Sequence, residues 1–334
     1  MTENTMSVEE FLEEWNNPSP TLLVHTSGST GKPKPILIEK RRMAASARIT
    51  CSFLGLHEGD TALLCMPLDY IAGKMMVVRA VTCGLRLVAV EPSGLPVWKE
   101  PIDFAAMVPL QVYNLLQTPD GSERLRNIRN LIIGGGSIDA ALATTLATFP
   151  HPVWSTYGMT ETLSHIALRP LNGPDASDWY TPLKGVSVSL NADNCLVINA
   201  PAVHDGPLVT NDIAELTTPV TNDTVGGAPQ CRFRILGRKD NVICSGGVKI
   251  QAEEVERLLL PHLSAPFLIT KRPDEKFGEV VVLLTEGDTK EAADVATQIL
   301  PKYWQPRLYI HVSQIPLTAT GKLARKDAER LALG

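Results

Sequence analysis

The sequence predicts an α/β fold in which a large N-terminal domain has a mainly parallel sheet and a β-rich subdomain, and a small α+β domain follows. Up to about residue 156, short apolar runs alternate with helical patterns, which is typical of βαβ units. Past Gly185 the pattern changes to paired strands, and from Asn241 a compact series of strands and helices resumes. We therefore expect one domain at residues 1–237 and a second at residues 238–334.

Local signals place the elements of the first part. Ser7-Val8-Glu9-Glu10 has the form of a capping box and predicts a short opening helix. Gly55 and Gly84 are expected to end the next two helices, since glycine adopts the left-handed conformation that follows a helix. The expected strands lie at residues 22–24, 61–66, 85–90, 131–133 and 153–156, and the later helices at 40–54, 71–83 and 139–148.

The second part is predicted to be richer in strands. Residues 186–190 and 195–198 flank Asn191-Ala192-Asp193-Asn194, which predicts a hairpin. Residues 217–229 are rich in Thr, Pro, Gly and Asn, and they predict a surface loop. The C-terminal series is expected to have strands at 242–244, 266–270, 279–285 and 308–312, and helices at 252–260 and 289–300.

Composition limits the possible functions. The net charge of −5 argues against a general nucleic-acid binder. The sequence has no run of about 18 apolar residues that would predict a membrane span. Residues 1–20 are acidic and lack the apolar core of a signal peptide, and the 6 cysteines contain no C-x-x-C pair. These features predict a cytoplasmic protein with reduced thiols.

The stretch from His25 to Pro35 has the chemistry of a polyphosphate site. It follows an apolar run and combines glycines, hydroxyls and lysines, which supply backbone N–H groups, hydrogen bonds and positive charge to an anion. It is not a P-loop, because Thr26 stands where the first glycine belongs and Pro33 follows the lysine. A flexible Ser/Gly linker is the alternative, which the preceding strand and two prolines make less natural.

Four further stretches carry polar side chains next to predicted strands. Each has a simpler alternative, such as a helix cap, a turn, a charged hairpin or a solvated helix start. The stretches are Trp154-Ser155-Thr156-Tyr157-Gly158-Met159-Thr160-Glu161-Thr162, Thr210-Asn211-Asp212, the block from Leu236 to Glu256, and Pro316-Leu317-Thr318-Ala319-Thr320-Gly321-Lys322-Leu323-Ala324-Arg325.

Together, these five stretches resemble the motifs of the acyl- and aryl-adenylate-forming enzymes, in the family's order from residue 25 to residue 325. The resemblance implies that ATP, Mg²⁺ and coenzyme A are bound. It assigns phosphate and nucleotide contacts to Thr26, Ser27, Gly28, Ser29, Thr30, Gly31, Lys34, Gly134, Gly135, Gly136, Tyr157, Gly158, Thr160, Asp212 and Arg238. In the family's T-G-D motif, Asn211 replaces the glycine, and we expect Asn to tolerate a left-handed turn there.

The resemblance also implies specific roles near the reaction. Glu161 is expected to coordinate Mg²⁺, and Lys322 to bridge the substrate carboxylate and the α-phosphate. Asp240 is expected to be the hinge about which a mobile C-terminal domain rotates, and Gly246-Gly247 to line a thiol tunnel. The implied reaction forms an acyl-adenylate and pyrophosphate, and then a thioester with coenzyme A.

The acid is predicted from the helix at 71–83. Asp69-Tyr70 replaces the family's usual aromatic–His pair, and Arg79 is a charge in an otherwise apolar helix. Burying a cation is costly unless an anion meets it, so Arg79 predicts either a substrate carboxylate or a structural salt bridge. The pattern resembles the o-succinylbenzoate–CoA ligases of menaquinone synthesis. Tyr70, Lys74 and Ser137 are further expected substrate residues.

The resemblance leaves open the acid and the acceptor. Only 24 residues precede the phosphate loop, so we expect the usual N-terminal subdomain to be absent. The acyl pocket is then completed within a compact chain, by a partner, or within a homodimer. The alternatives are another aryl or short dicarboxylic acid, a carrier-protein thiol as acceptor, or a nucleotide-binding module without catalysis.

Overall fold

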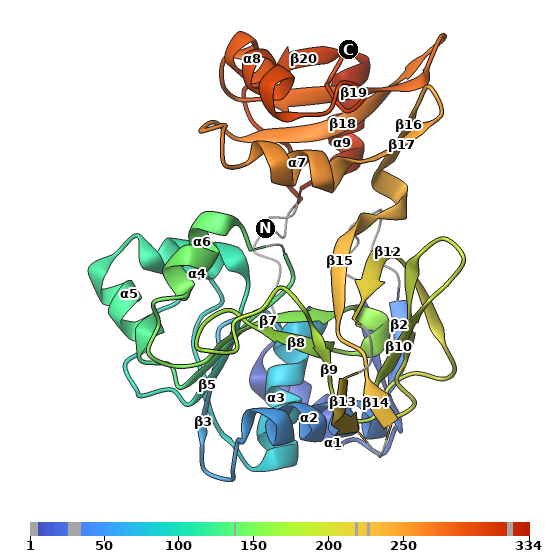
Figure 1. Ribbon diagram of the computed structural model, residues 1–334. Coiled ribbons are helices and arrows are strands. Elements are labelled where there is room, and N and C mark those ends of the chain that lie inside the picture. Colours follow the sequence, from blue (N-terminus) through green and yellow to red (C-terminus); the bar gives the residue numbers. More distant parts are fainter. Residues whose placement is uncertain (1–5, 26–34, 137, 218–219, 226–227, 319–322) are drawn as a thin grey trace. The chain divides into compact units, whose positions relative to one another are not determined.

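A computed structural model describes residues 6–25, 35–136, 138–217, 220–225, 228–318 and 323–334 (Figure 1). The chain forms two compact units. The first contains residues 1–188, 198–208 and 216–234, and the second contains residues 189–197, 209–215 and 235–334. The domain boundary expected at residues 237/238 stays a prediction.

In the described part of the first unit, a seven-stranded sheet has the order β4-β3-β5-β6-β7-β8-β9. The five strands from β4 to β7 pair in parallel, and β8 and β9 continue the sheet antiparallel. This confirms the predicted mainly parallel sheet. The strands are β3 (Thr61–Leu64), β4 (Arg86–Ala89), β5 (Phe104–Met107), β6 (Asn130–Ile133), β7 (Val153–Gly158), β8 (His165–Pro170) and β9 (Thr181–Pro182).

The central strands β3, β5 and β6 are buried along their whole length. Parallel strands covered on both faces have this continuous apolar pattern. Because Ile133 of β6 is in register with Ser155 of β7, the segments after these two strands lie at the same sheet edge. Ligands of open α/β sheets bind at this edge.

The helices of the first unit follow the predicted signals closely. Ser7 and Glu10 form the expected capping box of α1. Gly55 and Gly84 end α2 and α3 in the left-handed conformation, which confirms both predicted ends. The helices are α1 (Val8–Asn16), α2 (Lys40–Leu54), α3 (Ile71–Cys83), α4 (Pro109–Leu116), α5 (Pro119–Arg126) and α6 (Ala140–Leu146).

Further strands form separate sheets. β1 (Thr21–His25) pairs with β2 (Pro35–Glu39). A four-stranded sheet has the order β10-β11-β12-β15, with bounds Ser187–Leu190, Cys195–Asn199, Leu208–Leu216 and Phe233–Arg238. The predicted β10–β11 hairpin is confirmed, and Asn194 takes the left-handed conformation in its turn.

The prediction of a surface loop at residues 217–229 was wrong. β13 (Val220–Val225) and β14 (Ala228–Gln230) form an antiparallel pair there. Threonine and valine are β-branched residues that favour strands, and their preference outweighed the loop-like composition of the segment.

The second unit has a five-stranded sheet in which β17-β16-β19-β18 are consecutive and β20 pairs parallel with β19. Its strands are β16 (Val242–Ser245), β17 (Val248–Gln251), β18 (Phe267–Asp274), β19 (Gly278–Thr285) and β20 (Leu308–His311), and its helices are α7 (Ala252–Leu259), α8 (Thr289–Ile299) and α9 (Arg325–Leu333). One apolar core contains residues of α7 and α8, and another contains residues of α9.

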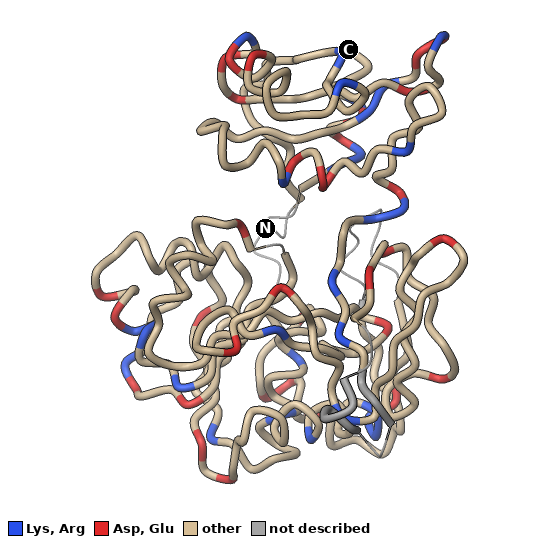
Figure 2. Tube along the Cα trace, in the orientation of Figure 1, with Lys and Arg blue, Asp and Glu red and all other residues tan. Residues whose placement is uncertain are grey.

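Charged residues of both signs are interspersed along the chain in each of the two units (Figure 2). Within the described ranges, no helix is both long enough and apolar enough to cross a bilayer.

Candidate active site

The glycine run after β6 lies against the end of β7. A Cβ atom at Gly134 would lie 2.1 Å from the Thr156 hydroxyl oxygen, so any other residue at this position would force the Thr156 side chain to move. Gly135 has a left-handed φ of 80°. At Gly158, a Cβ atom would lie 2.3 Å from the carbonyl oxygen of Ser164. The predicted glycines therefore permit close backbone packing around the end of β7.

Tyr157 belongs to an aromatic cluster beside this edge. Its ring centroid lies 5.1 Å from that of Phe233 and 5.8 Å from that of Tyr180. The Tyr180 hydroxyl is hydrogen-bonded to Ser155 Oγ at 2.9 Å. These contacts fix the position of an aromatic ring that is expected to lie against adenine.

A single 3₁₀ turn, Thr160–Thr162, carries the expected metal ligand. The buried Thr162 hydroxyl accepts a hydrogen bond from Met159 N and donates one to the carbonyl oxygen of Ser164, which holds the turn in place. Glu161 is exposed on this turn. Among the described residues, no group of three or more His, Cys, Asp or Glu is arranged to hold a metal. One exposed carboxylate still fits Mg²⁺, which commonly takes one or two carboxylates together with substrate phosphates.

In the second unit, Arg238 bridges two carboxylates. Its Nη1 lies 3.0 Å from Asp212 Oδ1, and its Nη2 lies 2.9 Å from Asp240 Oδ2. Asn211 Nδ2 also donates to Asp240, at 3.3 Å. Asn211 lies inside β12 and is not among the residues with positive φ, so the left-handed turn expected there is not observed. The structure thus joins the expected ribose contacts and the expected hinge in one network.

The expected thiol-tunnel glycines form the turn between β16 and β17. Gly246 has a φ of 58° and Gly247 a φ of 85°. Two consecutive left-handed residues are characteristic of a tight hairpin turn in which glycine is strongly preferred.

Arg79 is the largest of the fully buried side chains among the described residues. It is 2% exposed, and burial lowers the pKa of its guanidinium to about 10. Its Nη2 donates to Ser164 Oγ at 2.6 Å, whereas its buried Nε has no hydrogen-bond partner among the described residues. Its Cζ lies 5.9 Å from the centre of the Phe104 ring. No ion pair joins Arg79 to a carboxylate among the residues the structure describes, so the predicted structural salt bridge is not observed there.

The sequence did not predict the groups that hold Arg79. Ser164 Oγ lies 3.3 Å from Nδ1 of His165, and His165 Nε2 lies 3.0 Å from Thr50 Oγ1. Burial, and then the charge of Arg79, lower the pKa of His165 well below its usual value. His165, a lone histidine in the apolar strand β8, was the available signal for a buried polar contact. Its partner Thr50 lies on α2, 115 positions away in the sequence.

The other expected substrate residues have different neighbours. The Lys74 amine lies 3.3 Å from Met6 Sδ and 5.1 Å from the centre of the Phe11 ring, and burial lowers its pKa. Tyr70 is the residue before α3 and is 40% exposed. The structure therefore does not give Lys74 and Arg79 a shared set of contacts.

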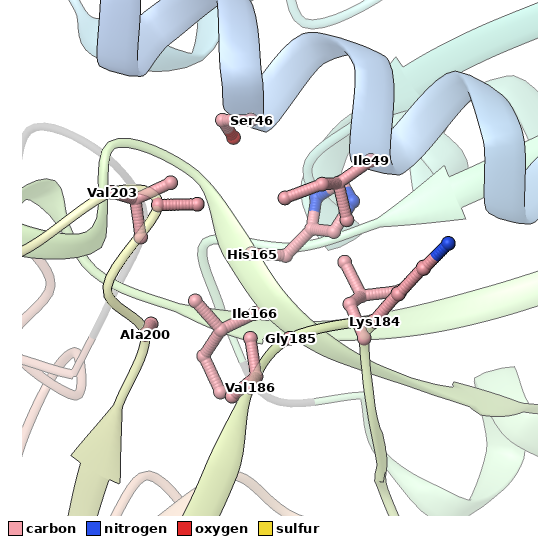
Figure 3. Close-up of a pocket in the computed structure, with 11 residues that line it drawn as sticks. Ser46, Ile49, His165, Ile166, Lys184, Gly185, Val186, Ala200 and Val203 are labelled. Atoms are coloured by element: carbon pink, nitrogen blue, oxygen red, sulfur yellow. The ribbon is translucent and has the colours of Figure 1, made fainter. Parts of the chain in front are cut away.

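A small pocket lies beside α2, with about 280 Å³ of space that includes open solvent. Ser46 and Ile49 project toward it from α2, and Ile166, Val186 and Val203 lie across from them (Figure 3). His165 is also part of its wall. None of the residues expected to contact the nucleotide lines this pocket.

Several expected site residues lie outside the described residues. They are Thr26, Ser27, Gly28, Ser29, Thr30, Gly31, Lys34, Ser137 and Lys322.

Comparison with known proteins identifies relatives of the whole chain. Residues 3–199 match the model of a family described as AMP-binding enzyme. The crystal structure of an acyl-CoA synthetase (AMP-forming)/AMP-acid ligase II-like protein from Dyadobacter fermentans is similar, with 32% identity and a TM-score of 0.64, and the match covers 97% of this chain and 93% of that one.

Two further matches are to succinylbenzoate ligases. A 2-succinylbenzoate–CoA ligase from Bacillus thuringiensis is 27% identical over 345 residues, which cover 96% of this chain and 71% of that protein. The o-succinylbenzoate CoA synthetase of Bacillus subtilis, in complex with the acyl-adenylate intermediate OSB-AMP, is 24% identical with a TM-score of 0.72. That match covers 92% of this chain and 68% of the synthetase. At 24% identity, the match to the Bacillus subtilis synthetase shows a shared fold alone.

Proposed function

Because the chain belongs to the AMP-binding enzyme family of acid–thiol ligases, we propose that it converts o-succinylbenzoate to o-succinylbenzoyl-CoA, a step of menaquinone biosynthesis, with ATP and Mg²⁺. The observation that carries the proposal is the buried guanidinium of Arg79. A cation without a carboxylate partner is costly to bury, and the second carboxylate of a dicarboxylic acid would supply the missing charge.

The first half-reaction is an attack by one carboxylate of the acid on the α-phosphorus of ATP. The new P–O bond forms as the bond to pyrophosphate breaks, and the product is an acyl-adenylate. In this proposal Lys322 bridges the carboxylate and the α-phosphate and offsets the charge that accumulates on phosphorus. Thr160 contacts the α-phosphate, and Glu161 would hold Mg²⁺, which would neutralise charge on the phosphates.

The sequence motifs assign the contacts to the nucleotide. Tyr157 lies against adenine, and Asp212 accepts hydrogen bonds from the ribose hydroxyls, with Arg238 as a second contact. The stretch 26–34 binds the β- and γ-phosphates. These assignments rest on the sequence motifs, and the contacts of Tyr157 and Asp212 support them by holding both side chains in defined positions.

The second half-reaction exchanges AMP for a thiol. The sulfur of coenzyme A attacks the activated carbonyl, the C–O bond to AMP breaks, and the thiol proton is lost to solvent. We place Asp240 at the hinge that moves the C-terminal domain between the two steps, and Gly246-Gly247 along the path of the thiol.

A second candidate is a ligase for another aryl or short dicarboxylic acid, with coenzyme A or a carrier-protein thiol as acceptor. The two succinylbenzoate ligases named above are 27% and 24% identical to this chain, which leaves the acid open.

ATP–pyrophosphate exchange, run with o-succinylbenzoate, phthalate, succinate, benzoate and octanoate, tests the proposal. We expect o-succinylbenzoate to support the fastest exchange and Arg79→Met to abolish its advantage over benzoate. Strong exchange with benzoate or octanoate and none with o-succinylbenzoate would contradict the proposal. A product assay with coenzyme A then tests the acceptor.

A further inference from the structure

The hydrogen bonds around Arg79 have a single consistent direction. Thr50 donates its one hydroxyl proton to the carbonyl oxygen of Ser46, at 3.1 Å, so its lone pairs face His165. His165 Nε2, 3.0 Å from Thr50 Oγ1, must then be the donor of that bond. A neutral imidazole protonated at Nε2 has an acceptor at Nδ1, and Ser164 Oγ lies 3.3 Å from it.

The direction continues to Arg79. When Ser164 donates its proton to His165, its oxygen presents lone pairs to Arg79 Nη2, which is 2.6 Å away. If His165 carried its proton at Nδ1 instead, Ser164 and Thr50 would each lose a partner of the correct kind. The arrangement is therefore satisfied by one tautomer of the histidine.

The surroundings favour this neutral tautomer. Thr50 is fully buried, and His165 is 8% exposed. A second positive charge beside the buried Arg79 would be unfavourable, and it would also remove the acceptor that Ser164 uses. The network therefore needs His165 uncharged in the same place where Arg79 is charged.

We propose that His165 is a positioning residue for acid recognition: held by Thr50 in its Nε2-protonated form, it orients Ser164, which in turn fixes the guanidinium of Arg79. This inference rests on the proposed function, in which Arg79 binds the second carboxylate of the acid. One N–H of Arg79 is committed to Ser164, while its buried Nε has no hydrogen-bond partner among the described residues. A guanidinium fixed in this way loses less side-chain entropy when a carboxylate binds.

A purely structural role for the same residues makes a different prediction. If His165 only fills the core between α2 and β8, its replacement would lower stability and affect every acid alike. A positioning role predicts a larger KM for dicarboxylic acids, with little change in kcat and little change for benzoate.

Replacing His165 by Asn or by Gln tests the hydrogen bonds of its two ring nitrogens one at a time. Asn places its amide near Nδ1 and can still accept from Ser164, whereas Gln places its amide near Nε2 and keeps only the bond to Thr50. We expect Ser164→Ala and His165→Gln to raise the KM for o-succinylbenzoate at least 10-fold, and His165→Asn to retain a KM within about 3-fold of wild type. Thr50→Val removes the oxygen that accepts from His165 Nε2 and should also raise this KM. Thr297→Val, at an exposed helical threonine that donates to the carbonyl oxygen of Ala293, is its control.

The ¹⁵N chemical shifts of the His165 ring, measured on the full chain between pH 5.5 and 8, test the network without a variant. We expect the neutral Nε2-protonated form throughout. An Nδ1-protonated ring, an imidazolium near neutral pH, or equal KM changes for o-succinylbenzoate and benzoate in His165→Gln would overturn the inference. A wild-type enzyme that does not prefer o-succinylbenzoate would instead contradict the proposed function, and the ring spectra would still decide the tautomer.

Discussion

The guanidinium of Arg325 forms a bidentate ion pair with Glu256, with Nη1 3.1 Å from Oε1 and Nη2 2.8 Å from Oε2. Arg325 also donates to the carbonyl oxygen of Ile269, and the Ile269 amide donates to Glu256. The pair thus joins α7, β18 and the first residue of α9. Because Arg325 stands three positions after Lys322, these contacts fix the chain directly beyond the expected catalytic lysine.

Glu256→Gln is expected to lower the free energy of unfolding by about 2 kcal/mol, because it leaves Arg325 without its main counter-charge in a mostly buried position. Urea unfolding of the full chain measures this change. Asp327→Asn is the matched control, since it breaks the exposed pair between Asp327 and Arg330 on the same helix and should cost less than about 0.5 kcal/mol. Equal losses in the two variants would contradict the structural role assigned to Glu256.

Arg79→Met is expected to keep or raise stability while abolishing selection of the acid. Methionine removes an unpaired buried cation and fills most of its volume, so we expect the free energy of unfolding to rise by about 1–2 kcal/mol. Arg42→Met is the comparison, because Arg42 is ion-paired with Glu39 and Asp205 and should lose stability on the same change. Both are measured by urea unfolding, and a large loss of stability in Arg79→Met would argue for a structural arginine.

Local signals predicted the fold better than they predicted the site. The capping box of α1 and the glycines after α2 and α3 are short-range signals, and the structure places these ends where the sequence does. The pair β13–β14 was missed, because its composition favoured a loop while its β-branched residues favoured strands.

The support around Arg79 could not be predicted for a different reason. Thr50, Ser164 and His165 come together only when α2 packs against the sheet, and no sequence spacing encodes that contact. The buried arginine itself could be predicted, since a charge within an apolar helix stands out in the sequence.

Stability should fall in mild acid because of His165. In the folded state the pKa of His165 is well below 6.5, while in the unfolded chain the pKa of the same side chain is about 6.5. Below that pH the unfolded state therefore binds more protons than the folded state. As the pH falls, the titration of His165 lowers the free energy of unfolding by up to about 1.4 kcal/mol per pH unit.

Urea unfolding at pH 5.0, 6.0 and 7.0 checks this slope. His165→Gln should show a shallower loss than wild type between pH 7.0 and 5.0, and His57→Gln, at an exposed histidine, is the control. The same slope in wild type and His165→Gln would mean that the buried histidine is protonated in the folded state.

Asp212→Asn should weaken ATP binding. Its carboxylate is paired with Arg238 and is the expected acceptor for the ribose hydroxyls, so the neutral amide loses charge-assisted hydrogen bonds. We expect the KM for ATP to rise about 10-fold or more, with a smaller change in the KM for the acid, as measured by pyrophosphate exchange. Asp193→Asn, which breaks the exposed pair with Lys239, is the control and should leave the KM for ATP nearly unchanged.

Lys322→Ala is expected to separate the two half-reactions. Its ammonium is assigned to the charge that builds up during adenylate formation, and that charge is no longer present once the acyl-adenylate exists. We therefore expect pyrophosphate exchange to fall by at least about 100-fold, while conversion of a supplied acyl-adenylate to the thioester stays within about 3-fold of wild type. Lys302→Ala, at an exposed lysine of the second unit, is the control for a general loss of positive charge. Exchange that survives in Lys322→Ala, or equal losses in both half-reactions, would show that the lysine does not act in the first step alone.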